Sequence, residues 1–161
     1  MNGRGRVVVG VSDSVPGLQA LRFAVAEARR RGMPLHAVRV WPMPPATRTG
    51  PVCLWHEDLT AETRRYVNAV FDAALGCLPG DIGITVAGPS GRADVALREM
   101  VSDVDLLVLG APSSRWHHSG VVRACTRDAR CPVIVVPPPE LARTVRWTSL
   151  RRLVREVIDQ T

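Results

Sequence analysis

Residues 6–41 read RVVVGVSDSVPGLQALRFAVAEARRRGMPLHAVRVW, and this stretch decides the fold. The apolar, β-branched run at 7–11 predicts a strand buried on both faces. Turn and capping residues at 12–17 precede apolar positions at helical spacing, and that helix is predicted to end at Gly32. A second apolar stretch at 35–41 predicts another strand. This order is a βαβ unit, whose two strands lie parallel and are joined by a right-handed crossover.

The same alternation continues along the rest of the chain. After a proline-rich stretch at 42–51, an apolar stripe from Leu59 to Leu78 predicts a second helix. Alternating residues at 82–86 predict an edge strand, whereas the wholly apolar 106–109 predict a central strand. The last strand is predicted at 133–136. Helices are predicted between these strands. The sequence therefore predicts an α/β fold with a doubly wound, five-stranded parallel sheet and helices on both faces.

The chain of 161 residues divides into two predicted parts. Residues 1–138 hold all five strands and are long enough for one domain. Residues 139–161 are predicted to be an amphipathic helical extension. Its apolar positions recur at helical spacing, with arginines between them, and must be buried against the same domain, a partner subunit or a membrane surface. The stripe consists of Trp147, Leu150, Leu153, Val154, Val157 and Ile158.

Composition excludes several classes of function. The net charge is +6, and every basic residue is an arginine. Without lysine the chain has neither a Walker A loop nor a Schiff-base site. No block of like charges indicates a nucleic-acid partner, and no apolar run is long enough to span a membrane. Four cysteines without a C-x-x-C pair indicate reduced thiols and a cytoplasmic location.

Catalytic and metal sites are not predicted. Cys53 and His56 could be two metal ligands, but no second pair follows at finger spacing. Ser90 lacks the strand–turn–helix setting of a hydrolase nucleophile, and no base can be paired with it. We therefore expect no catalytic residues, no bound metal and no enzymatic activity.

The topology predicts where a ligand would bind. In open parallel sheets, ligands lie beyond the carboxyl ends of the strands, where the strand order reverses. That point falls between the turn at 10–17 and the loop at 110–120, where two helix N-termini favour an anion such as phosphate. Arg115, His117, His118 and Arg123 could hold an anion or a modified nucleotide there. The alternative is that these side chains are simply solvated.

Four blocks, at residues 10–24, 35–41, 105–114 and 131–137, together resemble the universal stress protein (UspA-like) domain. The resemblance extends in order over residues 6–137. It implies a sheet of order 3-2-1-4-5 and a homodimer, which many members form through the last strand. Some members bind ATP, so the resemblance also makes ATP a candidate ligand.

The ATP-binding motifs of that family are altered in this chain. Members that bind ATP resemble G-V-D-x-S after the first strand, whereas Asp13 here comes one position later. After the fourth strand the family pattern is G-x2-G-x9-G-[S/T], and here only the first glycine, Gly110, is kept. Because a Cβ hinders positive φ and close backbone approach, ATP binding is predicted to be weak or lost. The candidate nucleotide-binding residues are Gly10, Val11, Ser12, Asp13, Val40, Gly110, Ser113, Arg115, His118, Arg123 and Ala124.

Two functions follow from this resemblance. The first is a cytoplasmic, homodimeric universal stress protein-like domain with a regulatory, stress-response or protein-interaction role and an unidentified protein partner. The alternative is an adenine-nucleotide-binding sensor with at most slow ATP hydrolysis through the altered Arg/His loop.

Overall fold

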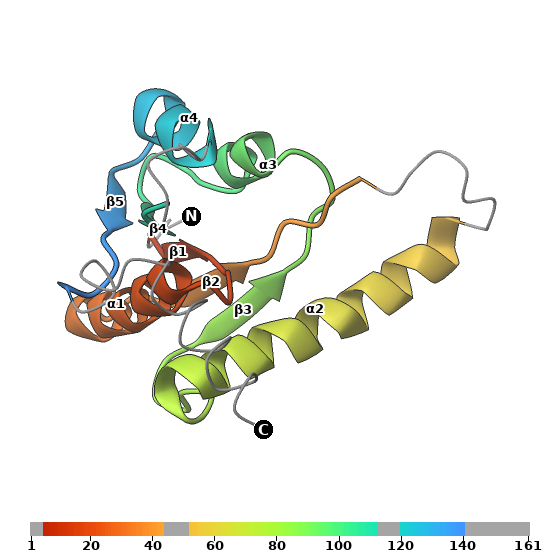
Figure 1. Cartoon of the computed structure of the whole chain (residues 1–161), viewed down its shortest axis with the longest axis horizontal. Helices are drawn as coiled ribbons and strands as arrows, with labels where there is room; N and C mark the ends of the chain where they lie inside the picture. The colour runs from red at the N-terminus through yellow and green to blue at the C-terminus, as the bar shows by residue number, and fades with distance from the viewer. Residues whose placement is uncertain (1–4, 44–51, 113–119, 141–161) are drawn as a thin grey trace, which may run out of the picture.

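The computed structural model describes residues 5–43, 52–112 and 120–140, with the backbone alone for 52–58. These residues form a five-stranded parallel sheet in the order β3-β2-β1-β4-β5 (Figure 1). The predicted fold class and strand order are thereby confirmed. The strands are β1 (Val7–Gly10), β2 (Leu35–Val38), β3 (Ile84–Ala87), β4 (Leu106–Gly110) and β5 (Val133–Val136).

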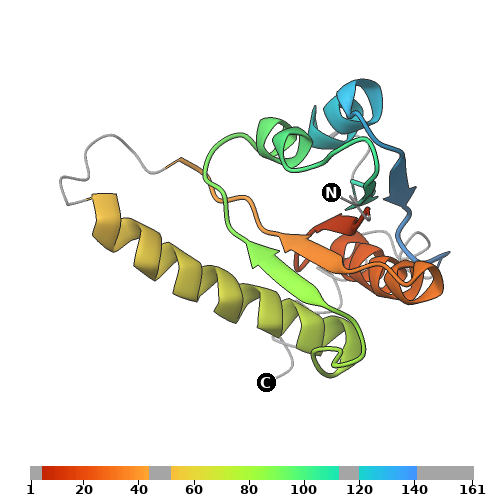
Figure 2. The same ribbon diagram turned by 180° about the vertical axis from the view of Figure 1, so that it is seen from behind.

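Helices cover both faces of this sheet. Helices α1 (Val15–Arg31) and α2 (Val52–Leu75) lie on one face, and α3 (Ala93–Glu99) and α4 (Gly120–Asp128) lie on the other (Figure 2). Side chains alternate along each strand, so β1 contributes to two separate cores. Val7 and Val9 pack beneath α1, whereas Val8 packs with Leu97 and Cys125 beneath α3 and α4.

Helix α1 begins and ends as its sequence predicts. The hydroxyl of Ser14 accepts a hydrogen bond from the Gly17 amide and caps the N-terminus. Gly32 adopts a left-handed φ of 63° and ends the helix. The three arginines at 29–31 occupy the last turn, where their positive charge complements the helix dipole.

Three element boundaries differ from the predictions. β2 ends at Val38 and pairing resumes only at Trp41, which bridges Ser90. Helix α2 stops at Leu75 because Gly76 adopts a φ of 81°, and Leu78 is consequently 47% exposed. β3 begins at Ile84 rather than at residue 82. The predicted helical extension, from residue 141 onward, lies outside the described residues.

Candidate functional site

A cleft of about 310 Å³ opens at the carboxyl ends of β1 and β4. It lies between the start of α1 and the start of α4, where the strand order of the sheet reverses. This is the place that the topology predicts for a ligand. The lining residues are Gly10, Val11, Ser12, Ser14, Gly17, Val38, Val40, Leu97, Leu109, Gly110, Ala111, Pro112, Val121 and Val122.

Five of the predicted site residues line this cleft: Gly10, Val11, Ser12, Val40 and Gly110. Of the six other predicted residues, three are described, and none of these three lines the cleft.

Asp13 is exposed and is not among the lining residues. Its backbone amide instead donates a hydrogen bond to the Tyr66 hydroxyl of α2. Arg123 and Ala124 belong to α4 but do not line the cleft. Ser113, Arg115 and His118 lie outside the described residues, as does the rest of the predicted Arg/His loop.

The two hydroxyl groups in the cleft are engaged with each other and with α1. Ser12 Oγ donates to Ser14 Oγ at 3.0 Å and accepts from the Ser14 amide at 3.2 Å. Ser14 Oγ in turn accepts from the Gly17 amide at 3.2 Å. The first turn of α1 therefore already has a polar partner supplied by its own chain.

The walls of the cleft are apolar. Val38 contributes from the end of β2, Val40 from the segment that follows it, Leu97 from α3, and Val121 and Val122 from the first turn of α4. Among the described lining residues, none carries a charged side chain. This surface suits a planar, uncharged group better than a polyphosphate, because an anion gains from charged or freely available polar partners.

The glycines beside the cleft are needed for close packing. A Cβ on Gly110 would lie 2.7 Å from the carbonyl carbon of Pro16. A Cβ on Gly17 would lie 2.4 Å from the carbonyl oxygen of Ser12. Both distances are far shorter than ordinary van der Waals contacts, so these glycines allow α1 to approach the strand ends.

An aromatic cluster fixes the end of β2 to α2. The Arg39 guanidinium lies 4.3 Å from the Tyr66 ring centroid and 5.0 Å from that of Trp41. Trp41 Nε1 donates to Thr63 Oγ1 at 2.8 Å. Burial raises the pKa of the Tyr66 hydroxyl above its usual value, so this group stays protonated at neutral pH. Because Val38 and Val40 line the cleft while Arg39 contacts α2, the cluster lies on the opposite face of the sheet.

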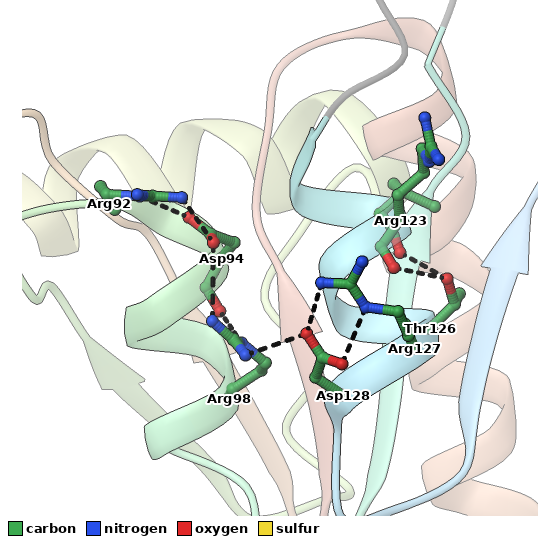
Figure 3. A network of polar contacts seen from close by, with 8 residues as sticks. Arg92, Asp94, Arg98, Arg123, Thr126, Arg127 and Asp128 are labelled. Atoms are coloured by element: carbon green, nitrogen blue, oxygen red, sulfur yellow. Dashed lines mark hydrogen bonds and ion pairs between the residues drawn. The ribbon is translucent and has the colours of Figure 1, made fainter.

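Ion pairs hold together the two helices that carry the cleft wall (Figure 3). Arg98 of α3 donates to the Asp94 carbonyl at 2.8 Å and to the Asp128 carboxylate of α4 at 3.3 Å. Arg92 also pairs with Asp94, at 3.0 Å. Beneath these contacts, Cys125 is fully buried. The network positions Leu97 of α3 relative to Val121 of α4.

No metal site is found in the described part of the chain. It holds no cluster of three or more His, Cys, Asp or Glu side chains that could bind a metal. The side chains of Cys53 and His56 lie outside the described residues. Cys125 and Cys131 are buried. Within the described ranges, no helix is both long enough and apolar enough to cross a bilayer.

A parallel sheet with a cleft at its switch point is the arrangement in which open α/β folds bind ligands. The universal stress protein family model matches residues 3–137 of the chain. The chain therefore belongs to the universal stress protein family.

Solved structures with the same fold are distant in sequence. Universal stress protein UspA from Lactobacillus plantarum is 21% identical, with a TM-score of 0.58, and the match covers 84% of this chain and 99% of that one. A universal stress protein in complex with cAMP is 21% identical, with a TM-score of 0.60 and coverage of 85% and 100%. The universal stress protein from Archaeoglobus fulgidus in complex with dAMP is also 21% identical, with a TM-score of 0.50 and coverage of 82% and 97%. A search of curated proteins gave no match.

Proposed function

We propose that residues 1–138 form a universal stress protein domain that acts as a cytoplasmic, homodimeric regulatory or protein-interaction module in the stress response. Residues 139–161 extend it. The domain performs no catalysis, and its affinity for ATP is weak or absent.

The apolar lining of the cleft carries this proposal. A triphosphate needs several amide or cationic partners, and the described lining residues offer two hydroxyls that already bond to each other. Gly110 is the only one of the family's phosphate-binding glycines that this chain keeps. Its close approach to Pro16 requires a glycine at this position whether or not phosphate binds. Asp13, the displaced acidic residue, does not line the cleft, and its backbone amide donates to the Tyr66 hydroxyl instead.

A thermal melt with and without millimolar Mg-ATP tests the loss of ATP binding. A ligand at about 100 times its Kd stabilises the folded state by about 2.7 kcal/mol, which is a shift of several degrees for a domain of this size. We expect no shift with Mg-ATP and no nucleotide bound to the purified protein. A shift of several degrees would overturn the proposal.

The exposed edge of β5 supports the homodimer. Among the described strands, β5 pairs only with β4, and all four of its residues are apolar and partly exposed. An apolar strand edge of this kind favours pairing with a second chain. The carbonyl groups of Pro132 and Val136 accept hydrogen bonds from β4. Because successive residues of a strand direct their backbone groups to opposite sides, the amide of Val135 points to the free edge.

A single substitution can therefore test the edge. Val135→Pro removes one outward N–H group, and we expect it to weaken the dimer at least tenfold in sedimentation equilibrium. Val135→Thr keeps that group and is the matched control. A monomeric wild-type chain, or equal dimer affinity in both variants, would contradict pairing through β5.

The second candidate function is an adenine-nucleotide-binding sensor with at most slow ATP hydrolysis. It is favoured by the two related structures solved with cAMP and dAMP, ligands that carry fewer charges than ATP. The same melts with cAMP and AMP test it. If either nucleotide stabilises the protein, Val40→Asp, at a position that lines the cleft, should reduce the shift, whereas Val104→Asp, at an exposed position before β4, should not.

A further inference from the structure

The outer face of α1 is an uncharged ridge. Val15, Gln19, Phe23 and Ala26 follow one another along this face at spacings of three or four residues. Val15 is 50% exposed and Phe23 is 37% exposed, although both are large apolar side chains. These residues span α1 from its first turn to its third.

Two basic side chains, Arg22 and Arg30, lie on the same face of α1, and each has a partner elsewhere. Arg22 donates to the Ala74 carbonyl of α2 at 2.6 Å. Arg30 pairs with Glu27 at 2.7 Å. With both arginines engaged elsewhere, the ridge offers an apolar surface about 16 Å long, given the rise of an α-helix.

The chain after β5 leaves the sheet close to the start of this ridge. The Ala111 amide donates to the Val136 carbonyl, so β5 ends beside the end of β4. There Gly110 touches Pro16 in the first turn of α1. The chain therefore leaves β5 at about one strand spacing, ~5 Å, from the end of β4, and that end of β4 contacts the first turn of α1.

The length of the following segment matches the ridge. Six residues, 137–142, can reach up to about 20 Å when extended. The apolar stripe from Trp147 to Ile158 would cover about 17 Å as a helix. Both the stripe and the ridge need an apolar partner, and each has the length and the position to cover the other.

We propose that residues 143–158 pack as an amphipathic helix along the outer face of α1 of the same chain. The helix starts near Val15 and runs parallel to α1. Its apolar stripe covers Phe23, and Arg151, Arg152 and Arg155 remain in solvent. This arrangement leaves the free edge of β5 open, so it does not depend on whether the protein forms a dimer.

Hydrogen exchange of the full chain is the first test. We expect the amides of 147–158 to exchange at least tenfold more slowly than in an unstructured peptide. Phe23→Asp should remove this protection, whereas Val104→Asp should keep it, because Val104 is also an exposed apolar side chain but lies before β4. Unprotected amides in the wild type, or equal protection in both variants, would overturn the proposal.

Disulfide trapping distinguishes packing within one chain from packing between chains. In a Cys53→Ser, Cys77→Ser background, Gln19→Cys with Leu150→Cys should oxidise to a monomeric, cross-linked product. The matched pair, Gln19→Cys with Arg152→Cys, places the second thiol on the solvent side and should react at least tenfold more slowly. Equal rates, or cross-linked dimers as the main product, would overturn packing within one chain.

Discussion

Gly110 lies so close to Pro16 that an added Cβ would meet the Pro16 carbonyl carbon at 2.7 Å. This contact joins the end of the central strand β4 to the first turn of α1. It forms the floor of the cleft and sets how closely the helix approaches the sheet.

Gly110→Ala should therefore destabilise the fold. Its methyl group meets backbone atoms, which cannot move as a flexible side chain does, and such overpacking costs about 1–3 kcal/mol. Urea unfolding followed by circular dichroism measures this loss. Gly80→Ala is the control, because nothing lies within 4 Å of its added Cβ. Equal stability of the two variants would contradict the close contact.

His36 should make stability depend on pH. Its Nδ1 lies 2.6 Å from Thr85 Oγ1, and its Nε2 has no partner among the described residues. Burial, with a smaller contribution from Arg6, lowers the pKa of His36 below 6.5, while Asp105 opposes this shift. The unfolded chain therefore binds the proton more readily, and stability present above pH ~6.5 is lost as pH falls through the folded pKa.

The measurement is the free energy of unfolding between pH 5 and 7.5. We expect it to fall toward pH 5 in the wild type and to fall less steeply in His36→Gln, which keeps a polar group for Thr85. Identical slopes would show that another group is responsible.

Asp105 anchors the turn before β4. Its carboxylate accepts hydrogen bonds from the Arg6 and Ser102 amides at 3.0 and 2.9 Å. Burial opposes ionisation, but these two bonds and the Arg6 charge hold the pKa of Asp105 below 3.8. Its stabilising effect is thus present above pH ~4 and is lost as pH falls through the folded pKa.

Asp105→Asn should lower the free energy of unfolding by about 1–3 kcal/mol at pH 7, since an amide accepts these bonds less well. The difference from wild type should shrink at pH 3. Asp103→Asn, at an exposed position in the same turn, should behave as wild type. A constant difference at both pH values would argue against an ionised anchor.

The cysteines should differ in reactivity. Cys77 is exposed, whereas Cys125 and Cys131 are buried, and burial raises the pKa of Cys125 to about 11. Because the thiolate is the reactive form, iodoacetamide at pH 7.5 should label Cys77 in the native protein and the two buried thiols only after unfolding. Peptide mapping by mass spectrometry follows each site. Native labelling of Cys125 as fast as that of Cys77 would contradict its burial.

The full strand order was implied by the family resemblance, but the edge position of β3 and the central position of β4 were predictable because burial leaves a clear pattern in the sequence. The wholly apolar β4 is buried along four of its five residues, whereas the alternating β3 is only partly buried. Element ends were harder to predict. The left-handed turn at Gly76 ends α2 before the apolar stripe does, and a stripe alone does not show where such a turn falls.

The cleft was predictable only in part. Strand ends and glycines indicated Gly10, Ser12 and Gly110, because backbone turns have distinctive residues. Apart from Val11 and Val40, the apolar lining was missed, since a valine facing a cleft and a valine facing the core have the same spacing. Val38 is 1% exposed while Val40, two residues later on the same face, is only partly buried, and both line the cleft.

The position of β1 has a consequence for how the protein is made. Val7 pairs with Leu35 on one side and with Leu106 on the other, so β1 has one near partner and one distant partner in sequence. During synthesis β1, β2 and β3 can pair as soon as they emerge, while the other edge of β1 waits for β4. Until then a nascent chain exposes an apolar strand edge, and this is the stage at which it most needs protection from aggregation. The first strand made therefore gains its second neighbour only after β4 has been synthesised.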